Sequence, residues 1–103
     1  MNVILASNSP RRSQLLSLGN WTFSVTASDV DESKLPDENP AQYVLRLAKA
    51  KARAVAQTAQ PDYIIIGADT AVVDSGDILG KPIDTAEAVT MLTRLRGHSH
   101  QVY

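Results

Sequence analysis

The sequence contains no cysteine, which excludes disulfide bonds and thiolate metal sites. It has no apolar run of membrane-spanning length, and its first residues lack the basic stretch and apolar core of a secretion signal. Ten lysines and arginines balance eleven acidic residues, and this argues against a general nucleic-acid binder, which needs a basic face. We therefore expect one small cytoplasmic domain with no nucleic-acid or membrane partner.

Glycine is absent from residues 1–18, so the N-terminal region has no glycine-rich phosphate loop. In its place, an apolar run of strand length, Val3–Ala6, leads into small polar residues and then Pro10. Ser9 is a good helix N-cap, and proline suits the first helical turn. The pattern predicts a strand, a short loop and a helix that begins at Pro10.

Arg11 and Arg12 fall in the first turn of this predicted helix, where the backbone already carries a partial positive charge. A bound phosphate would explain this placement, because backbone N–H groups, serine hydroxyls and guanidinium groups could hold it together. The alternative is a surface helix with two solvated arginines.

The remaining chain alternates predicted helices and strands. Leucines at 15, 16 and 18 predict an apolar helix face that ends at Gly19, and alternation over 21–27 predicts a half-buried strand. A long helix follows Asn39–Pro40, and the apolar run Tyr63–Ile66 predicts a buried central strand. Residues 71–80 read as a β-hairpin, after which Asp84 or Thr85 caps a helix with an apolar stripe at 88, 89, 92 and 95 that ends at Gly97.

Three charged residues lie at positions where they could belong to a ligand-binding or catalytic site. Asp69 follows the predicted buried strand, where ligands gather in open α/β sheets and where a carboxylate needs a partner. The alternative is that Asp69 is an ordinary turn residue with no functional role. Lys51 lies near the apolar stripe of the long helix and could simply extend its ammonium group to solvent. Lys81, held extended before Pro82, is either a phosphate contact or an exposed loop lysine.

Residues 98–103 begin to alternate as in a strand, with His98 and His100 on one face. Two histidines at this spacing can bind a metal. With no third ligand nearby in the sequence, a polar strand face is the simpler interpretation. The pattern stops without a turn, and this favours a fragment whose sheet continues elsewhere.

Five ordered blocks give the chain a resemblance to a known family. The segment Leu5-Ala6-Ser7-x-Ser9-Pro10-Arg11-Arg12 resembles the opening motif of the Maf family of nucleoside triphosphate pyrophosphatases. The other blocks are Asp31-Glu32, Leu47-Ala48-x-x-Lys51-Ala52, Ile66-Gly67-Ala68-Asp69-Thr70 and Leu79-Gly80-Lys81-Pro82. The resemblance covers the whole chain, which we interpret as the N-terminal part, residues 1–103, of a single Maf-like domain.

The resemblance implies an elongated α/β fold with a mixed sheet flanked by helices, similar to inosine triphosphatase. It also implies hydrolysis of nucleoside triphosphates to monophosphate and pyrophosphate with a divalent metal, Mg or Mn. Carried over by motif, Asp69 would be the proton acceptor, and Glu32 and Asp69 would hold the metal. The phosphate-binding residues would be Ser7, Arg11, Arg12, Lys51 and Lys81.

Arg11 and Thr70 match the residues found in family members that prefer dTTP and UTP, so the resemblance implies these substrates and possibly modified nucleotides. A homodimer is common in the family. Family members are longer than this chain, so an incomplete domain is expected. The alternatives are a nucleotide-binding module without turnover and a regulator of cell division.

Overall fold

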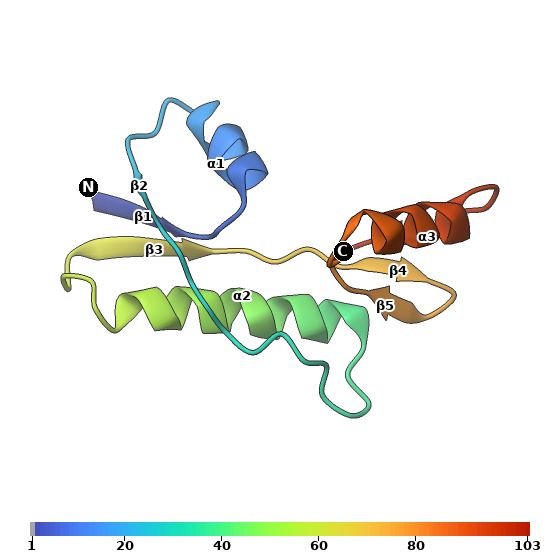
Figure 1. The fold of residues 1–103 in the computed structure, drawn as a ribbon. Helices are drawn as coiled ribbons and strands as arrows, with labels where there is room; N and C mark the ends of the chain where they lie inside the picture. The colour runs from blue at the N-terminus through green and yellow to red at the C-terminus, as the bar shows by residue number, and fades with distance from the viewer. Residues whose placement is uncertain (1) are drawn as a thin grey trace.

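The computed structural model describes residues 2–103, which form an elongated α/β molecule of 46 × 31 × 23 Å. Two three-stranded sheets lie end to end along it, with helix α2 (Pro40–Ala56) beneath the first and helix α3 (Thr85–Leu95) beside the second (Figure 1). The predicted α/β architecture, a combination of parallel and antiparallel sheets with flanking helices, is confirmed. No helix within residues 2–103 is both long and apolar enough to cross a bilayer.

The first sheet is parallel, with strand order β2-β1-β3. β1 (Asn2–Ala6) is the central strand, and β2 (Ser24–Thr26) and β3 (Tyr63–Gly67) pair with its two sides. In register, Ala6 lies opposite both Thr26 and Gly67. All three strands therefore end at the same edge of the sheet, and the segments that follow them leave from that edge.

The prediction that 63–66 is the central strand was wrong. Among residues 2–103, β3 pairs with β1 alone, so β1 takes the buried position, with Val3 to Ala6 all buried, while Ile64 is 45% exposed. The core combines Ile4 and Ala6 of β1 with Val55 of α2, and α2 covers β3.

Two N-terminal predictions were also wrong in part. Strand β2 is shorter than the predicted 21–27, none of its residues is buried, and Trp21 and Val25 are 53% and 50% exposed. Helix α1 (Pro10–Ser17) begins at Pro10 with Ser9 as its N-cap, as predicted, but Leu15 and Leu18 are exposed. The left-handed residue after α1 is Asn20, with φ 58°, rather than Gly19. Leu15 and Leu16 nevertheless line an open apolar pocket together with Leu5, Ile66 and Ala68.

Helix α2 and the connection that follows bring the chain back beside β1. Asn39 caps α2, and its side chain and that of Gln42 bond each other's backbone N–H groups in a capping box. At the far end of β3, Gly67 lies against α2 so closely that a Cβ atom would collide with the carbonyl oxygen of Ala48. The absent side chain lets the end of β3 approach the helix, and Asp69 follows two residues later.

The second sheet is antiparallel, with order β5-β4-β6. β4 (Val72–Asp74) and β5 (Asp77–Leu79) form the predicted hairpin, whose turn residues Ser75 and Gly76 both have positive φ, as a type I′ hairpin turn requires. Strand β6 covers only Gln101–Val102, so the predicted strand from 98 is shorter than expected.

Helix α3 confirms Asp84 as its N-cap, since the Asp84 carboxylate accepts the Glu87 N–H at 2.8 Å, and Gly97 follows its C-terminus with φ 81°. Its predicted apolar stripe is packed only in part, because Ala88 and Leu95 are partly buried whereas Val89 and Leu92 are 58% and 68% exposed.

Candidate active site

A buried ion pair lies where the first sheet ends. Lys51 Nζ, on α2, is 2.9 Å from Asp69 Oδ1, which follows β3. It is also 3.3 Å from Glu32 Oε1, in the segment after β2. The side chains of Lys51 and Asp69 are only 9% and 6% exposed, whereas Glu32 is 48% exposed. One ammonium group therefore joins two carboxylates that are far apart in the sequence.

Lys51 is thus not a solvated residue at the edge of a helix stripe. Its position faces the carboxyl edge of the parallel sheet, and the Asp69 carboxylate provides the partner that a nearly buried charge requires. Asp69 is likewise more than a turn residue, since its Oδ1 accepts a hydrogen bond from Lys51.

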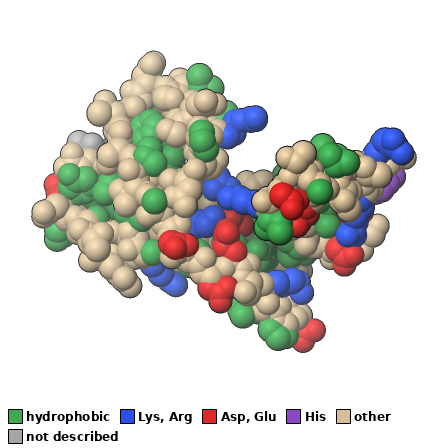
Figure 2. All heavy atoms as spheres, viewed as in Figure 1, with side chains coloured by type: hydrophobic (Ala, Val, Ile, Leu, Met, Phe, Trp, Pro, Cys, Tyr) green, Lys and Arg blue, Asp and Glu red, His purple; other side chains and the backbone are tan. Residues whose placement is uncertain are grey.

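A cavity of about 510 Å³ opens beside this pair, between the two sheets. Figure 2 shows acidic and basic side chains side by side around the hollow in this part of the surface. The polar side chains that line the cavity are Arg12, Glu32, Tyr43, Asp69, Thr70 and Lys81. The apolar side chains that line it come from β4, β5 and α3 and are Val72, Ile78, Leu79 and Met91. The lining of the cavity therefore combines charged and apolar groups.

A second, narrow cavity of about 60 Å³ lies under the loop after β1. Its lining includes Ser9 at the N-cap of α1, together with Arg12, Lys51 and Lys81. Arg12, Glu32 and Lys81 line both cavities, so the two form neighbouring parts of one site. Its three cationic side chains and the helix N-terminus can bind an anion, and the carboxylates of Asp29 and Glu32 in the same lining can bind a cation that accompanies it.

Arg12 makes one defined contact in this site. Its Nη2 donates a hydrogen bond of 3.1 Å to Thr70 Oγ1, which joins the first turn of α1 to the residue after Asp69. Arg11, by contrast, is exposed and lines neither cavity. Of the two adjacent arginines, Arg12 therefore lies in the site and Arg11 on the exposed surface of α1.

Ser7 is buried beneath the loop rather than exposed in a cavity. Its N–H donates to the carbonyls of Leu5 and Thr26, and its Oγ accepts the N–H of Ser9 at 3.0 Å. The hydroxyl thus shapes the turn that leads into α1.

Sequence reasoning missed Tyr43, which it placed only on the apolar face of α2. The phenol lines the larger cavity and donates a 2.6 Å hydrogen bond to the carbonyl of Glu32. Burial raises the pKa of Tyr43, and the negative charges of Asp69 and Glu32 raise it further, so the phenol stays protonated as a donor. The sequence signal that could have found it is the spacing of Tyr43 and Lys51, which lie eight residues apart on one helix and so on nearby faces.

The histidines do not share a strand face. His98 lies before β6, and its Nε2 is 2.8 Å from Asp74 Oδ1. Within residues 2–103 no three His, Cys, Asp or Glu side chains cluster as a metal site. The acidic pair Glu32 and Asp69 could still share a cation with a bound ligand, since Mg²⁺ is commonly held by one or two carboxylates plus phosphate oxygens.

Comparison with known proteins places this arrangement in a family. The Maf-like protein family model matches residues 2–103. A protein of Hahella chejuensis named dTTP/UTP pyrophosphatase is 50% identical over 102 residues, which cover 97% of this chain and 51% of that protein. Proteins with the same name from Geotalea uraniireducens and Symbiobacterium thermophilum are each 52% identical, covering 98% and 97% of this chain and 52% and 51% of theirs.

The chain thus spans about half the length of the curated relatives that it matches. The family match extends over every residue that carries the site, from the loop after β1 to the hairpin that lines the cavity. On this match the chain belongs to the Maf family.

Proposed function

We propose that this chain carries the catalytic residues of a nucleoside triphosphate pyrophosphatase that converts dTTP and UTP to the monophosphate and pyrophosphate. The observation that carries the proposal is the Lys51–Asp69 pair, in which a nearly buried carboxylate faces a cavity that Arg12 and Lys81 also line. The relatives' names supply the substrates.

The cavity suits a nucleotide because its lining combines charged and apolar groups. A triphosphate carries about four negative charges, which Arg12 and Lys81 in the cavity and Lys51 beside it can oppose, while a divalent cation at Glu32 and Asp69 would offset these two carboxylates. The apolar residues Ile78, Leu79 and Met91 can pack against a base. Ser7 would support the phosphate-binding loop, and Arg11 would meet the substrate from the exposed face of α1. For Thr70 we propose a role in substrate choice, since its hydroxyl is bound to Arg12 inside the cavity.

Asp69 would act as the general base. Its carboxylate accepts a proton from a water molecule as the water oxygen bonds to the α-phosphorus. The bond from the α-phosphorus to the bridging oxygen then breaks, and pyrophosphate leaves. Lys51 keeps the carboxylate in place, while Arg12 and Lys81 stabilise negative charge on the phosphate oxygens.

A divalent metal, Mg or Mn, fits the donor chemistry of the site. Glu32 and Asp69 both approach one cationic group already, and hard oxygen ligands suit these ions. When bound, the ion would neutralise phosphate charge and assist the departure of pyrophosphate. Homodimerisation and a cytoplasmic location stay predictions from the sequence.

The test is pyrophosphate release by this chain with magnesium, comparing dTTP, UTP, GTP and ATP. We expect release from dTTP and UTP in preference to the purine nucleotides. A folded chain that binds dTTP, measured by calorimetry, but releases no pyrophosphate would refute the proposal and identify a nucleotide-binding module.

A further inference from the structure

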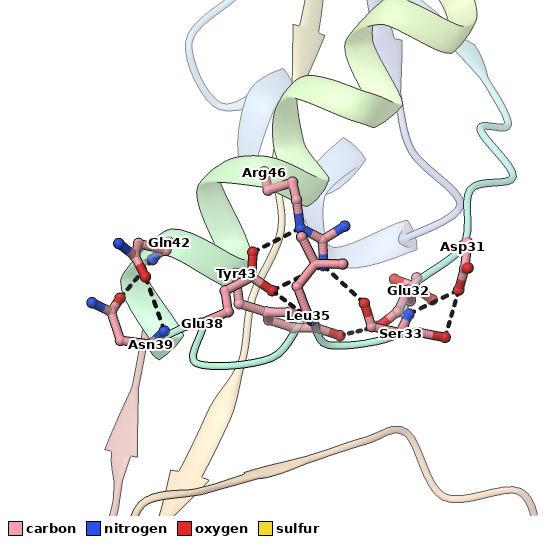
Figure 3. Close-up of polar contacts among 9 residues, drawn as sticks. All are labelled: Asp31, Glu32, Ser33, Leu35, Glu38, Asn39, Gln42, Tyr43 and Arg46. Atoms are coloured by element: carbon pink, nitrogen blue, oxygen red, sulfur yellow. Dashed lines mark hydrogen bonds and ion pairs between the residues drawn. The ribbon is translucent and has the colours of Figure 1, made fainter.

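The acidic loop, which we define as residues 31–38, brings Glu32 to the site without a helix or strand of its own. Most of its residues are exposed, so apolar packing contributes little to its position. Figure 3 shows instead that polar contacts with the first turns of α2 hold it. The location of the Glu32 carboxylate must depend on these contacts.

The peptide unit that follows Glu32 is held at both of its polar groups. Tyr43 Oη donates a 2.6 Å hydrogen bond to the carbonyl of Glu32. The N–H of the same peptide unit, which belongs to Ser33, donates to Asp31 Oδ1 at 2.9 Å. Because both ends of this unit are bound, rotation of the backbone next to the Glu32 side chain is restricted.

Arg46 binds the same loop at two further points (Figure 3). Its Nη2 donates to the carbonyl of Ser33 at 2.8 Å, and its Nε and Nη2 donate to the two carboxylate oxygens of Glu38 at 2.7 and 3.0 Å. The Glu38 side chain is only 8% exposed, and Arg46 lowers the pKa of its carboxyl group. This two-point contact of Arg46 links Ser33, near the start of the loop, to Glu38 at its end.

One helix therefore carries Lys51 and both residues that bind the loop. Tyr43 and Arg46 are three residues apart and lie on one face, with the guanidinium 5.7 Å from the centre of the phenol ring. Since α2 is a regular helix from Pro40 to Ala56, the distance from these two side chains to Lys51 is fixed. The helix thereby sets where the loop meets Lys51.

We propose that Tyr43 and Arg46 are positioning residues, which hold the acidic loop so that the Glu32 carboxylate stays beside Lys51. Neither residue needs to touch the reacting atoms. The consequence for catalysis rests on the proposed function, but the positional effect does not, so the two can be tested separately.

The positional effect is measured by NMR on the free chain. In wild type we expect a nuclear Overhauser effect between the γ-protons of Glu32 and the ε-protons of Lys51, and amide order parameters near 0.85 at residues 32 and 33, typical of a rigid backbone. Tyr43→Phe and Arg46→Gln should abolish the Overhauser effect and lower the order parameters toward about 0.6. Arg46→Lys keeps the charge but not the two-point contact, and should show an intermediate loss.

Two matched controls use the same residue types elsewhere. Tyr63→Phe removes a phenol hydroxyl from β3, and Arg53→Gln removes an exposed cation from α2. Both should leave the Overhauser effect and the order parameters unchanged. If Tyr43→Phe also leaves them unchanged, the proposal is wrong; should Arg46→Gln fail to fold, Tyr43→Phe decides alone.

The catalytic consequence is measured in a double-variant cycle with dTTP. We expect Tyr43→Phe to lower kcat about tenfold with little change in KM, because a displaced group costs rate more than binding. In a Glu32→Gln background the same change should have almost no further effect. An equal loss in both backgrounds would mean a general structural role and would overturn the proposal. If wild type shows no turnover, the proposed function fails, and the NMR comparison still decides the positional effect.

Discussion

Lys51 Nζ, on helix α2, donates to Asp69 Oδ1, in the loop after β3, at 2.9 Å, and the two residues are 18 positions apart in the chain. Both side chains are almost removed from solvent. The Glu32 carboxylate, 3.3 Å from the same nitrogen, is about half-exposed and shares the positive charge from the cavity side. The Lys51–Asp69 contact is therefore the buried pair, and Glu32 is its accessible neighbour.

Removal of the lysine should destabilise the fold. Lys51→Met leaves the Asp69 carboxylate without its cation in a nearly buried position, and we expect a loss of about 3 kcal/mol in the free energy of unfolding. Urea unfolding followed by circular dichroism measures it. Lys49→Met, at an exposed position on the same helix, should change stability little.

The double variant Lys51→Met/Asp69→Asn separates charge from packing. It should recover part of the lost stability, because the carboxylate charge is gone. If it is as unstable as Lys51→Met, the loss comes from packing of the lysine stem rather than from the buried charge.

Asp69→Asn should abolish pyrophosphate release, since an amide cannot accept the proton. We expect kcat with dTTP to fall by at least about a hundredfold, within the range for a general base. Circular dichroism should show an intact fold, and dTTP should still bind. Full turnover in this variant would exclude Asp69 as the base.

Thr70→Val should loosen Arg12 in the cavity. The change keeps the side-chain shape but removes the hydroxyl that accepts the Arg12 hydrogen bond. One such bond is worth about 1 kcal/mol, so we expect KM for dTTP to rise about fivefold. Thr22→Val, at an exposed site away from the cavity, is the control. An unchanged KM and an unchanged ratio of dTTP to GTP turnover would argue against a role for this contact.

Acid should weaken the contacts that join the β4–β5 hairpin to Arg94 of α3 and to His98. Asp74 is buried and accepts hydrogen bonds from Arg94 Nε and His98 Nε2, each at 2.8 Å, and these partners lower the pKa of its carboxyl group. A lowered pKa in the folded state means that this contribution to stability is present at neutral pH and is lost as the pH falls below about 4.

The variant Asp74→Asn isolates this contribution. It should be less stable than wild type at pH 7, and the difference should shrink as the pH falls below about 4. Thermal unfolding across a pH series provides the measurement. Asp29→Asn, at an exposed carboxylate, should show no such convergence. A constant difference between Asp74→Asn and wild type at all pH values would contradict the assignment.

Local sequence signals predicted the elements that depend on neighbours in the chain. Ser9, Asn39 and Asp84 cap their helices because each cap needs only a side chain and the N–H groups two or three residues ahead. The hairpin at Ser75 and Gly76 follows from backbone preferences of two residues.

Burial was harder to predict, because it depends on what packs against an element. An apolar pattern made Tyr63–Ile66 resemble a central strand, whereas pairing on both sides gives that position to β1. The leucines of α1 have helical spacing, yet Leu15 and Leu18 are 59% and 78% exposed. A pattern shows which face is apolar but not whether a partner lies there.

The sequence by itself determined the family motifs, the helix caps and the residue types of the candidate site. Tertiary structure alone decided that Lys51 is buried against Asp69, that Arg12 rather than Arg11 meets Thr70, and that Tyr43 binds the backbone beside Glu32. The reason is physical: three parallel strands in register end at one edge, and only this pairing brings segments distant in the chain within hydrogen-bond distance.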